Sequence, residues 1–218
     1  EALEQAGIPL ILVSSKTRAE ILTLRKDLAN RHPFIVENGA AVFIPTHYFT
    51  QQPANTTERE GYWVWELAPP RSQWLAILED LANEFSGCFD SFDRAGVAGI
   101  MSMTGLSEQQ AVAANQREYS EPVRWLASPE QEAQFVQRLQ EAGATVARGG
   151  RFISVSGRCD KGSALTRLRG HYPLAAGQTV IDDLAIGDSA NDTPMLEVAG
   201  TALVVRSPVH DYPSLTRS

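Results

Sequence analysis

The segment "GDSAND" places two carboxylates and one amide directly after a short apolar run. Asp188 comes first, and Asn191 and Asp192 follow it closely. Carboxylates gathered at a strand end repel each other by roughly 4 kcal/mol per pair at about 4 Å and an effective dielectric near 20, so we expect a compensating cation nearby. Oxygen ligands of this kind suit Mg²⁺, whereas the alternating pattern of a calcium loop is absent. For Asp192 alone, a helix N-cap is an equally good interpretation.

Two other polar residues, Lys161 and Ser14, also lie at the start of a predicted helix or the end of a predicted strand. Lys161 falls in the first turn of a predicted helix, where the helix dipole disfavours a cation. It is therefore either a solvated surface lysine or a lysine directed at a phosphate or at the neighbouring carboxylates. Ser14 ends an apolar run just before a helix, where a hydroxyl and backbone N–H groups can bind phosphate, although "SSKT" alone is more often a simple loop.

Alternating helices and apolar strands surround these positions. Apolar strands are predicted at 9–13, 34–45 (interrupted by a polar turn), 184–188 and 201–205, with helices over 17–32, 160–172 and 193–200. This alternation indicates an α/β fold with a doubly wound parallel, Rossmann-like sheet. Ligands of such sheets bind outside the carboxyl ends of the strands, where Ser14 and Asp188 are expected.

The stretch from residue 46 to residue 157 has a different pattern of predicted helices and strands, which indicates an inserted α/β domain. It holds predicted strands at 61–68 and 122–127 and predicted helices at 72–85, 107–118 and 128–143, the last two with Ser107 and Ser128 as N-caps. A strand pair that turns at Gly149 and Gly150 follows. We therefore predict a core domain from residues 1–45 and 158–218 and a cap domain from residues 46–157. The four tryptophans fall in this cap, where core packing is a better interpretation than stacking on a sugar.

Composition limits the class of partner. The net charge of −7 argues against a protein that binds duplex nucleic acid. No apolar run approaches the roughly 20 residues that a membrane-spanning helix needs. The two cysteines, Cys88 and Cys159, show no paired spacing, which favours a reducing compartment and a cytoplasmic location.

The ordered set of a strand-end serine, a lysine in "DKG" and "GDSAND" resembles motifs two, three and four of the haloacid dehalogenase superfamily of phosphatases. The segments "ILVSSKTRAEI", "PFIVENGAAVFIP", "GLSEQQAVAANQREYSEP" and "GGRFISV" resemble the mannosyl-3-phosphoglycerate phosphatase branch, and the match covers nearly the whole chain. The resemblance implies a haloacid dehalogenase core, an α/β cap that selects the substrate, and a cytoplasmic enzyme that forms the compatible solute mannosylglycerate.

The resemblance also implies roles for the residues of the core. Ser14 would bind the transferring phosphoryl oxygen, and Lys161 would neutralise the phosphate and the nucleophile. Asp188 would ligate Mg²⁺, while Asn191 and Asp192 would support the metal and orient Lys161.

Further residues would contact the phosphorylated sugar-glycerate substrate. Those near the core motifs are Ser15, Lys16, Thr17, Glu37 and Asn38, and those of the cap are Arg117, Glu118 and Arg151. For the cap residues, ordinary surface charge is an equally good interpretation.

One departure from the family pattern concerns its first motif, Asp-x-Asp-Gly-Thr, which is absent. Because the chain opens like the end of a helix, we expect the strand with the nucleophilic aspartate upstream of Glu1, and the 218-residue chain to be inactive alone. The complete enzyme would act through an aspartyl-phosphate intermediate. The alternatives are a phosphatase for glucosyl-3-phosphoglycerate or another sugar phosphate, and a non-catalytic protein that binds phosphosugars.

Overall fold

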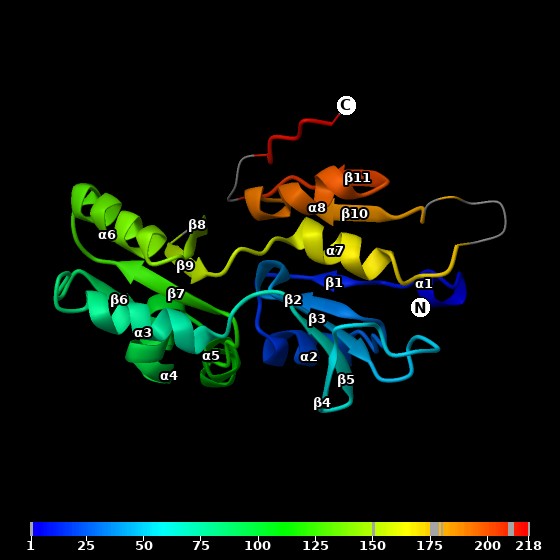
Figure 1. Cartoon of the computed structure of the whole chain (residues 1–218), viewed down its shortest axis with the longest axis horizontal. Helices are drawn as coiled ribbons and strands as arrows, with labels where there is room; N and C mark the ends of the chain where they lie inside the picture. The colour runs from blue at the N-terminus through cyan, green and yellow to red at the C-terminus, as the bar shows by residue number, and fades with distance from the viewer. Residues whose placement is uncertain (1, 150, 175–178, 180, 209–211, 218) are drawn as a thin grey trace. The chain divides into compact units, whose positions relative to one another are not determined.

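The computed structural model describes residues 2–149, 151–174, 179, 181–208 and 212–217 (Figure 1). Contacts divide the chain into two compact units. The first contains residues 1–15, 30–67 and 159–218, and the second contains residues 16–29 and 68–158. Within the described part of the chain, none of the helices is both long enough and apolar enough to span a membrane.

The first unit is built mainly from short strands joined by loops and turns. In chain order its elements are α1 (Ala2–Gln5), β1 (Leu12–Val13), β2 (Phe34–Val36), the 3-10 turn η1 (Glu37–Gly39), β3 (Ala41–Pro45), β4 (Thr57–Arg59), β5 (Tyr62–Glu66), α7 (Lys161–Arg169), β10 (Leu184–Gly187), the 3-10 turn η2 (Ala190–Asp192), α8 (Thr193–Val198) and β11 (Thr201–Val204).

These strands form two sheets. Five strands in the order β1-β2-β3-β5-β4 make a mixed sheet, in which β1 and β2 are parallel and the remaining pairs are antiparallel. The second sheet is the parallel pair β10 and β11, with Leu184 opposite Thr201. Both parallel pairs occur where the sequence predicts parallel strands, so the α/β class is confirmed, while antiparallel β3, β4 and β5 extend the larger sheet.

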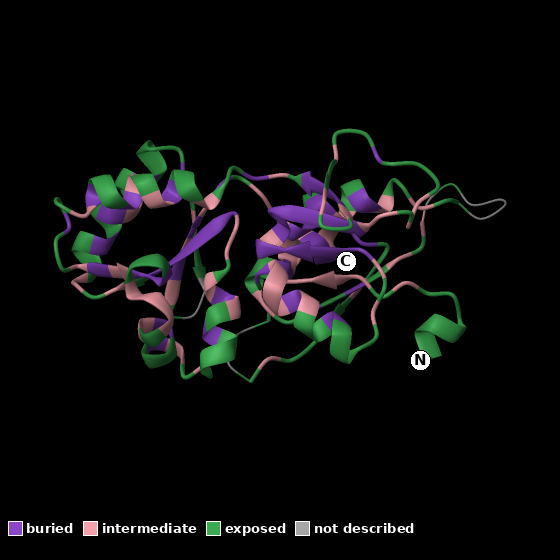
Figure 2. Cartoon of the chain, turned by 90° about the horizontal axis from the view of Figure 1, so that it is seen from below, coloured by how far each residue is buried: buried purple, intermediate pink, exposed green. Residues whose placement is uncertain are grey.

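Helix α7 provides the apolar cover for the larger sheet. Its Ala164 and Leu168 are buried against Ile35 of β2 and Val42 of β3. Helix α8 packs in the same way on β10, where Leu196 is fully buried beside Ala185. Most strand residues of the larger sheet are buried, as the purple strands in Figure 2 show. The two packed helices therefore hold the ends of several strands in fixed places.

The second unit contains most of the long helices. Its elements are α2 (Arg18–Asp27), α3 (Arg71–Leu81), β6 (Phe89–Ser91), α4 (Phe92–Thr104), α5 (Glu108–Asn115), β7 (Ser120–Trp125), α6 (Pro129–Glu141), β8 (Thr145–Gly149) and β9 (Phe152–Ser156). The four strands form an antiparallel sheet in the order β6-β7-β9-β8.

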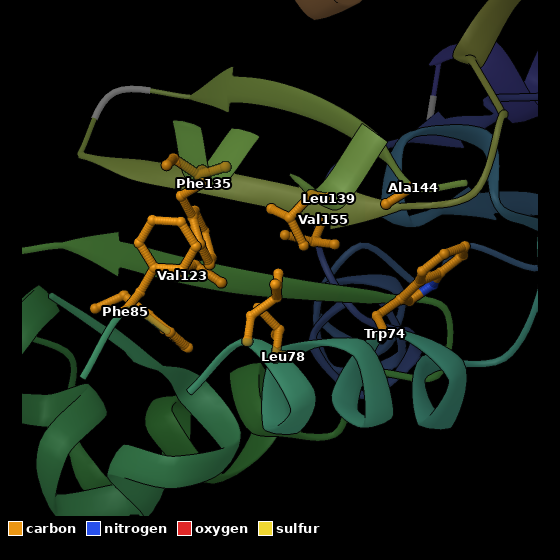
Figure 3. Close-up of a cluster of buried hydrophobic side chains, with 11 residues drawn as sticks. Trp74, Leu78, Phe85, Val123, Phe135, Leu139, Ala144 and Val155 are labelled. Atoms are coloured by element: carbon orange, nitrogen blue, oxygen red, sulfur yellow. The ribbon is translucent and has the colours of Figure 1, made fainter. Parts of the chain in front are cut away.

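The core of the second unit lies between this sheet and helices α3 and α6 (Figure 3). Trp74 and Leu78 project from α3, and Phe135 and Leu139 project from α6, at the spacing that places them on one helix face. Phe135 and Leu139 are fully buried. A separate cluster around Ile100 joins α4 to α5.

Local helix signals in the sequence are confirmed. Thr17, Ser107 and Ser128 are the N-caps of α2, α5 and α6, and Thr17 and Ser107 form capping boxes. The predicted strand pair is present as β8 and β9, although Gly150, in its predicted turn, lies outside the described residues. Helix α4 has no counterpart among the predicted elements, and its Gly96 adopts a non-helical conformation.

The boundary between the units differs from the one predicted from sequence. The sequence places the start of the cap near residue 46, whereas the first unit continues to Leu67. The reason is that β5 pairs along its length with β3 of the larger sheet. Trp63 and Trp65 consequently belong to the first unit, where both are buried, and core packing accounts for them. Helix α2, expected in the core, is grouped with the second unit.

Candidate functional site

Lys161 and Asp192 form a buried ion pair at the start of α7. The side-chain carboxylate of Asp160 accepts a hydrogen bond from the backbone N–H of Ser163 at 2.8 Å, so α7 begins directly at Lys161. Lys161 is only 5% exposed, and its Nζ donates to Asp192 Oδ1 at 2.6 Å. The interpretation of Lys161 as a solvated surface lysine is therefore wrong.

The second carboxylate oxygen of Asp192 is also fully engaged. Asp192 Oδ2 accepts hydrogen bonds from the backbone N–H groups of Asp188 and Ser189 and from the Ser189 hydroxyl, at 3.1, 3.2 and 3.1 Å. Burial alone would raise the pKa of Asp192, but the hydrogen bond and charge of Lys161, together with the donors at 188 and 189, outweigh it and lower the pKa. Asp192 is thus held as a carboxylate that contacts the Lys161 ammonium directly.

Close backbone contacts explain how residues so far apart in sequence meet. A Cβ atom at Gly162 would lie 2.2 Å from the Pro194 carbonyl oxygen, and one at Gly187 would lie 2.5 Å from the Asp192 Cβ. A Cβ at Gly39, whose φ is +97°, would lie 2.1 Å from the Asp160 carbonyl oxygen. Since real Cβ atoms are not found at such distances, the ends of β2, β10 and α7 can converge only with glycine at these three positions.

A second set of contacts joins the strand ends of β1, β2 and β10. The backbone N–H of Asn38 donates to the Ser14 carbonyl at 2.9 Å. Asn191 Nδ2 donates to Asn38 Oδ1 at 3.0 Å, and Asn191 Oδ1 accepts from the Ser189 hydroxyl at 2.5 Å. Asn191 therefore orients Asn38, while Asp192 is the residue that orients Lys161. The predicted core residues Ser14, Asn38, Lys161, Asp188, Asn191 and Asp192 thus belong to one connected group.

Glu37 and Ser15 flank this group. Glu37 is 1% exposed and has a left-handed φ of 47°, whereas Ser15 is exposed. Burial, together with the carboxylates of Asp160 and Glu37, raises the pKa of the Cys159 thiol to about 11. A raised pKa favours the neutral thiol, which is a weaker nucleophile than the thiolate.

Asp188 differs from Asp192 in its surroundings. It is the first residue after β10, and its side chain is exposed. Among the described residues, no group of three or more His, Cys, Asp or Glu could hold a metal by itself. The donor set nevertheless fits Mg²⁺, which keeps several waters and needs one or two protein carboxylates. Since Lys161 already balances Asp192, Asp188 is the carboxylate available for such an ion.

The remaining predicted residues lie in the second unit, and two of them serve α2. Thr17 is fully buried; its hydroxyl accepts from the backbone N–H of Glu20 at 3.2 Å and donates to the Ala113 carbonyl at 2.8 Å. The exposed Lys16 forms an ion pair with Glu20 at 2.9 Å. Both contacts stabilise the start of α2, so the geometry of Thr17 favours a structural role over a substrate contact.

Arg117, Glu118 and Arg151 occupy loops and strand starts of the second unit. Arg117 Nη1 donates to the Ser120 hydroxyl at 2.9 Å, and Glu118 accepts from Arg18 Nε at 2.9 Å. Arg151 is exposed, and its Nη2 lies 3.5 Å from the Thr104 carbonyl. Arg117 and Glu118 are thus held in a partly buried segment, while Arg151 is on the surface of this unit.

Sequence reasoning missed Ser189 and Arg18. Ser189 binds both Asn191 and Asp192, and its position three residues before Asp192 is a capping-box spacing that could have identified it. Nothing in the sequence indicates that Arg18 meets Glu118, because the partners are separated by 100 residues.

The architecture and the core group are similar to those of haloacid dehalogenase-like hydrolases. A model of the haloacid dehalogenase-like hydrolase family matches residues 107–209. A haloacid dehalogenase-like hydrolase of B. subtilis has a TM-score of 0.57 at 18% identity, covering 92% of this chain and 78% of its own, which shows the shared fold.

Two curated relatives indicate members of this family to which the chain is similar in sequence. A glucosyl-3-phosphoglycerate/mannosyl-3-phosphoglycerate phosphatase of Methanococcoides burtonii is 33% identical over 97% of this chain and 77% of its own. A mannosyl-3-phosphoglycerate phosphatase of Pyrococcus horikoshii is 37% identical over 96% of this chain and 82% of its own. The chain therefore belongs to the haloacid dehalogenase-like hydrolases and is a phosphatase of the branch that contains these relatives.

Proposed function

We propose that this phosphatase removes phosphate from mannosyl-3-phosphoglycerate and gives mannosylglycerate. The observation that carries the proposal is the connected group at the strand ends, in which the buried Lys161 is fixed 2.6 Å from Asp192 beside Asp188. The two relatives support this substrate, since the name of each includes mannosyl-3-phosphoglycerate. Glucosyl-3-phosphoglycerate is the second candidate because the Methanococcoides burtonii relative carries both names.

The charges of the core group support phosphoryl transfer. The ion pair of Lys161 and Asp192 is neutral as a unit, so the carboxylate of Asp188 leaves the group net negative. A phosphate monoester would be repelled there without a further cation, which favours Asp188 as a ligand of Mg²⁺. When bound, Mg²⁺ would neutralise charge on the phosphoryl oxygens. Lys161 would contribute its ammonium, and Ser14 its hydroxyl, to the same oxygens.

The proposed route is the two-step transfer that the family resemblance implies. An aspartate carboxylate would attack phosphorus and displace the alkoxide of mannosylglycerate, which takes up a proton. Water would then attack the aspartyl-phosphate, which releases inorganic phosphate and restores the carboxylate. In both steps the role of this chain is to hold the phosphoryl group in place through Ser14 and Lys161. Asp192 holds the Lys161 ammonium in one position through their 2.6 Å hydrogen bond, which reduces the reorganisation that each step requires.

The second unit would supply the contacts that distinguish the substrate. Arg117 and Arg151 are the candidates for the glycerate carboxylate, because a guanidinium can bind it through two parallel hydrogen bonds. Glu118 is the candidate acceptor for sugar hydroxyls. Arg117 and Glu118 are better ordered for this task than Arg151, since both are partly buried and held by neighbours in the unit.

The test is phosphate release by the purified full-length protein from mannosyl- and glucosyl-3-phosphoglycerate, with Mg²⁺ and after chelation by EDTA. We expect release from the mannosyl compound, loss of release with EDTA and recovery when Mg²⁺ is restored. Tight binding of either compound without release would instead identify a phosphosugar-binding protein. Release from unrelated sugar phosphates at the same rate would contradict the proposed substrate.

A matched pair of variants tests the role of Asp188. Asp188→Asn keeps the size of the side chain but removes its charge, and we expect at least a hundredfold loss of kcat/KM, about 2.7 kcal/mol of transition-state stabilisation. Asp182→Asn changes another exposed aspartate, which lies before the opposite end of β10, and should behave as wild type. Full activity of Asp188→Asn would overturn the metal role.

A further inference from the structure

Arg71 contacts three points of one short segment in the second unit. The segment runs from Asn115, the last residue of α5, to Glu121, the second residue of β7. Arg71 Nη1 donates to the Asn115 carbonyl at 2.8 Å, and Nη2 donates to Asn115 Oδ1 at 3.0 Å. At the other end of the segment, Arg71 Nε donates to Glu121 Oε2 at 2.6 Å. The backbone N–H of Arg71 donates to the Glu118 carbonyl in the middle at 2.7 Å.

The position of the Arg71 guanidinium is unfavourable for a cation in two respects, the helix dipole and burial. Arg71 is the first residue of α3, where the helix dipole disfavours a cation. Its side chain is only 12% exposed, and that of Glu121 is 0% exposed. The other oxygen of Glu121 accepts from the backbone N–H of Asp93, in the first turn of α4, at 2.8 Å. A buried charge pair is weak evidence for stability as such, because desolvation opposes it, so a positional role is the better explanation.

The segment that Arg71 holds carries both Arg117 and Glu118. Arg117 bonds Ser120 within the segment, and Glu118 bonds Arg18 of α2. Trp74, one turn further along α3, adds a hydrogen bond from its indole N–H to the Tyr119 carbonyl at 2.9 Å. Arg71 and Trp74, one turn apart on α3, therefore hold the backbone of residues 115–121 through hydrogen bonds.

We propose that Arg71, with Glu121, is a positioning residue that fixes Arg117 and Glu118 for recognition of the sugar-glycerate part of the substrate. This inference rests on the proposed function, in which Arg117 and Glu118 are the substrate contacts. Arg71 acts through the segment and does not itself touch the substrate.

The experiment compares Arg71→Lys and Arg71→Gln with wild type in the full-length protein. Lysine keeps the charge but cannot reach three acceptors with a planar fork, so both variants should raise KM for mannosyl-3-phosphoglycerate by roughly tenfold or more. The kcat for p-nitrophenyl phosphate, which lacks the sugar and the glycerate, should stay within about twofold of wild type. A merely structural role would lower both activities in proportion to the folded fraction.

Two further arms make the result decisive. Adding Arg71→Gln to the double variant Arg117→Ala/Glu118→Ala should raise KM no further, because the residues through which Arg71 acts are gone. Arg138→Gln is the matched control: Arg138 pairs with Glu84 and Glu141 on the same unit, at half exposure, and should leave KM unchanged. An additive rise of KM in the combined variant would overturn the positioning role.

Amide hydrogen exchange separates this inference from the proposed function. In Arg71→Gln we expect faster exchange in residues 116–121 and unchanged protection of β9. Unchanged exchange in that segment would overturn the inference, whatever the substrate. If wild type releases no phosphate from mannosyl- or glucosyl-3-phosphoglycerate, the proposed function fails and with it the assigned substrate, while the exchange result still decides whether Arg71 fixes the segment.

Discussion

At the scale of single residues, the central feature of the site is that Asp188 and Asp192 differ in burial and in hydrogen bonding. In the sequence both are carboxylates of one short motif, four residues apart. Asp192 is buried and accepts four hydrogen bonds, one from Lys161 and three from residues 188 and 189. Asp188 is exposed beyond the end of β10. The same side chain therefore anchors a cation in one place and remains available for a metal in the other.

The lowered pKa of Asp192 leads to a prediction about acid stability. Its folded-state pKa lies below the usual 3.8, so ionised Asp192 stabilises the fold above about pH 4, and this stabilisation is lost as the pH falls through the folded-state value. Asp192→Asn should be less stable than wild type at neutral pH and should lose less stability on acidification. Urea unfolding between pH 7 and pH 3 measures both, with Asp182→Asn as control. Parallel pH profiles for wild type and Asp192→Asn would contradict the lowered pKa.

At the scale of elements, the start of α2 shows how one hydroxyl can serve two segments. Thr17 caps α2 and simultaneously bonds the Ala113 carbonyl of α5. The contact pair of Arg18 and Glu118 lies beside it. Both contacts belong to the second unit, so polar groups at the start of α2 bind it to α5 and to the segment that follows α5.

Substitution of Thr17 distinguishes a cap from a substrate contact. Thr17→Ala removes the cap and the hydrogen bond to Ala113, and we expect a loss of roughly 1–2 kcal/mol in the free energy of unfolding. Thr17→Ser keeps the hydroxyl and should retain most of the stability. Urea unfolding gives these values, and steady-state kinetics of the same proteins gives KM. A stable Thr17→Ala variant with a raised KM would indicate a substrate contact instead.

At the scale of the whole molecule, each unit has a hydrophobic core of its own. The first unit is centred on Ile35, Trp65 and Leu168, and the second on Trp74, Phe135 and Leu139. The four-stranded sheet of the second unit is formed entirely by residues 89–156. Its folding should therefore depend little on the first unit.

We expect the segment 68–158 to fold when it is expressed alone. Domains of about 60 residues or more commonly fold independently when they enclose a core, and this segment lacks only α2 of its unit. Dispersed amide signals in a two-dimensional NMR spectrum and a cooperative urea transition would show folding. Phe135→Ala should destabilise it by about 3–5 kcal/mol, since Phe135 is fully buried. A random-coil spectrum of the unsubstituted segment would contradict independent folding.

The sequence by itself determined the local elements and the order of the core motifs. Capping at Thr17, Ser107 and Ser128 was predictable because a cap and its partner are three residues apart. The family resemblance, confirmed by the relatives, followed from the same local motifs. Whether Asp192 was a cap or a partner of Lys161 could not be decided at that level.

Only the tertiary structure decided which distant residues meet. Lys161 reaches Asp192 because Gly162 allows the backbone of α7 to approach Pro194, a contact that no pattern along the chain encodes. β5 joins the larger sheet through its pairing with β3, and Arg71 reaches residue 121 across the second unit. Such contacts depend on how whole elements pack, whereas caps and strand ends depend on residues that are neighbours along the chain. Local structure could therefore be predicted from the sequence, and long-range contacts could not.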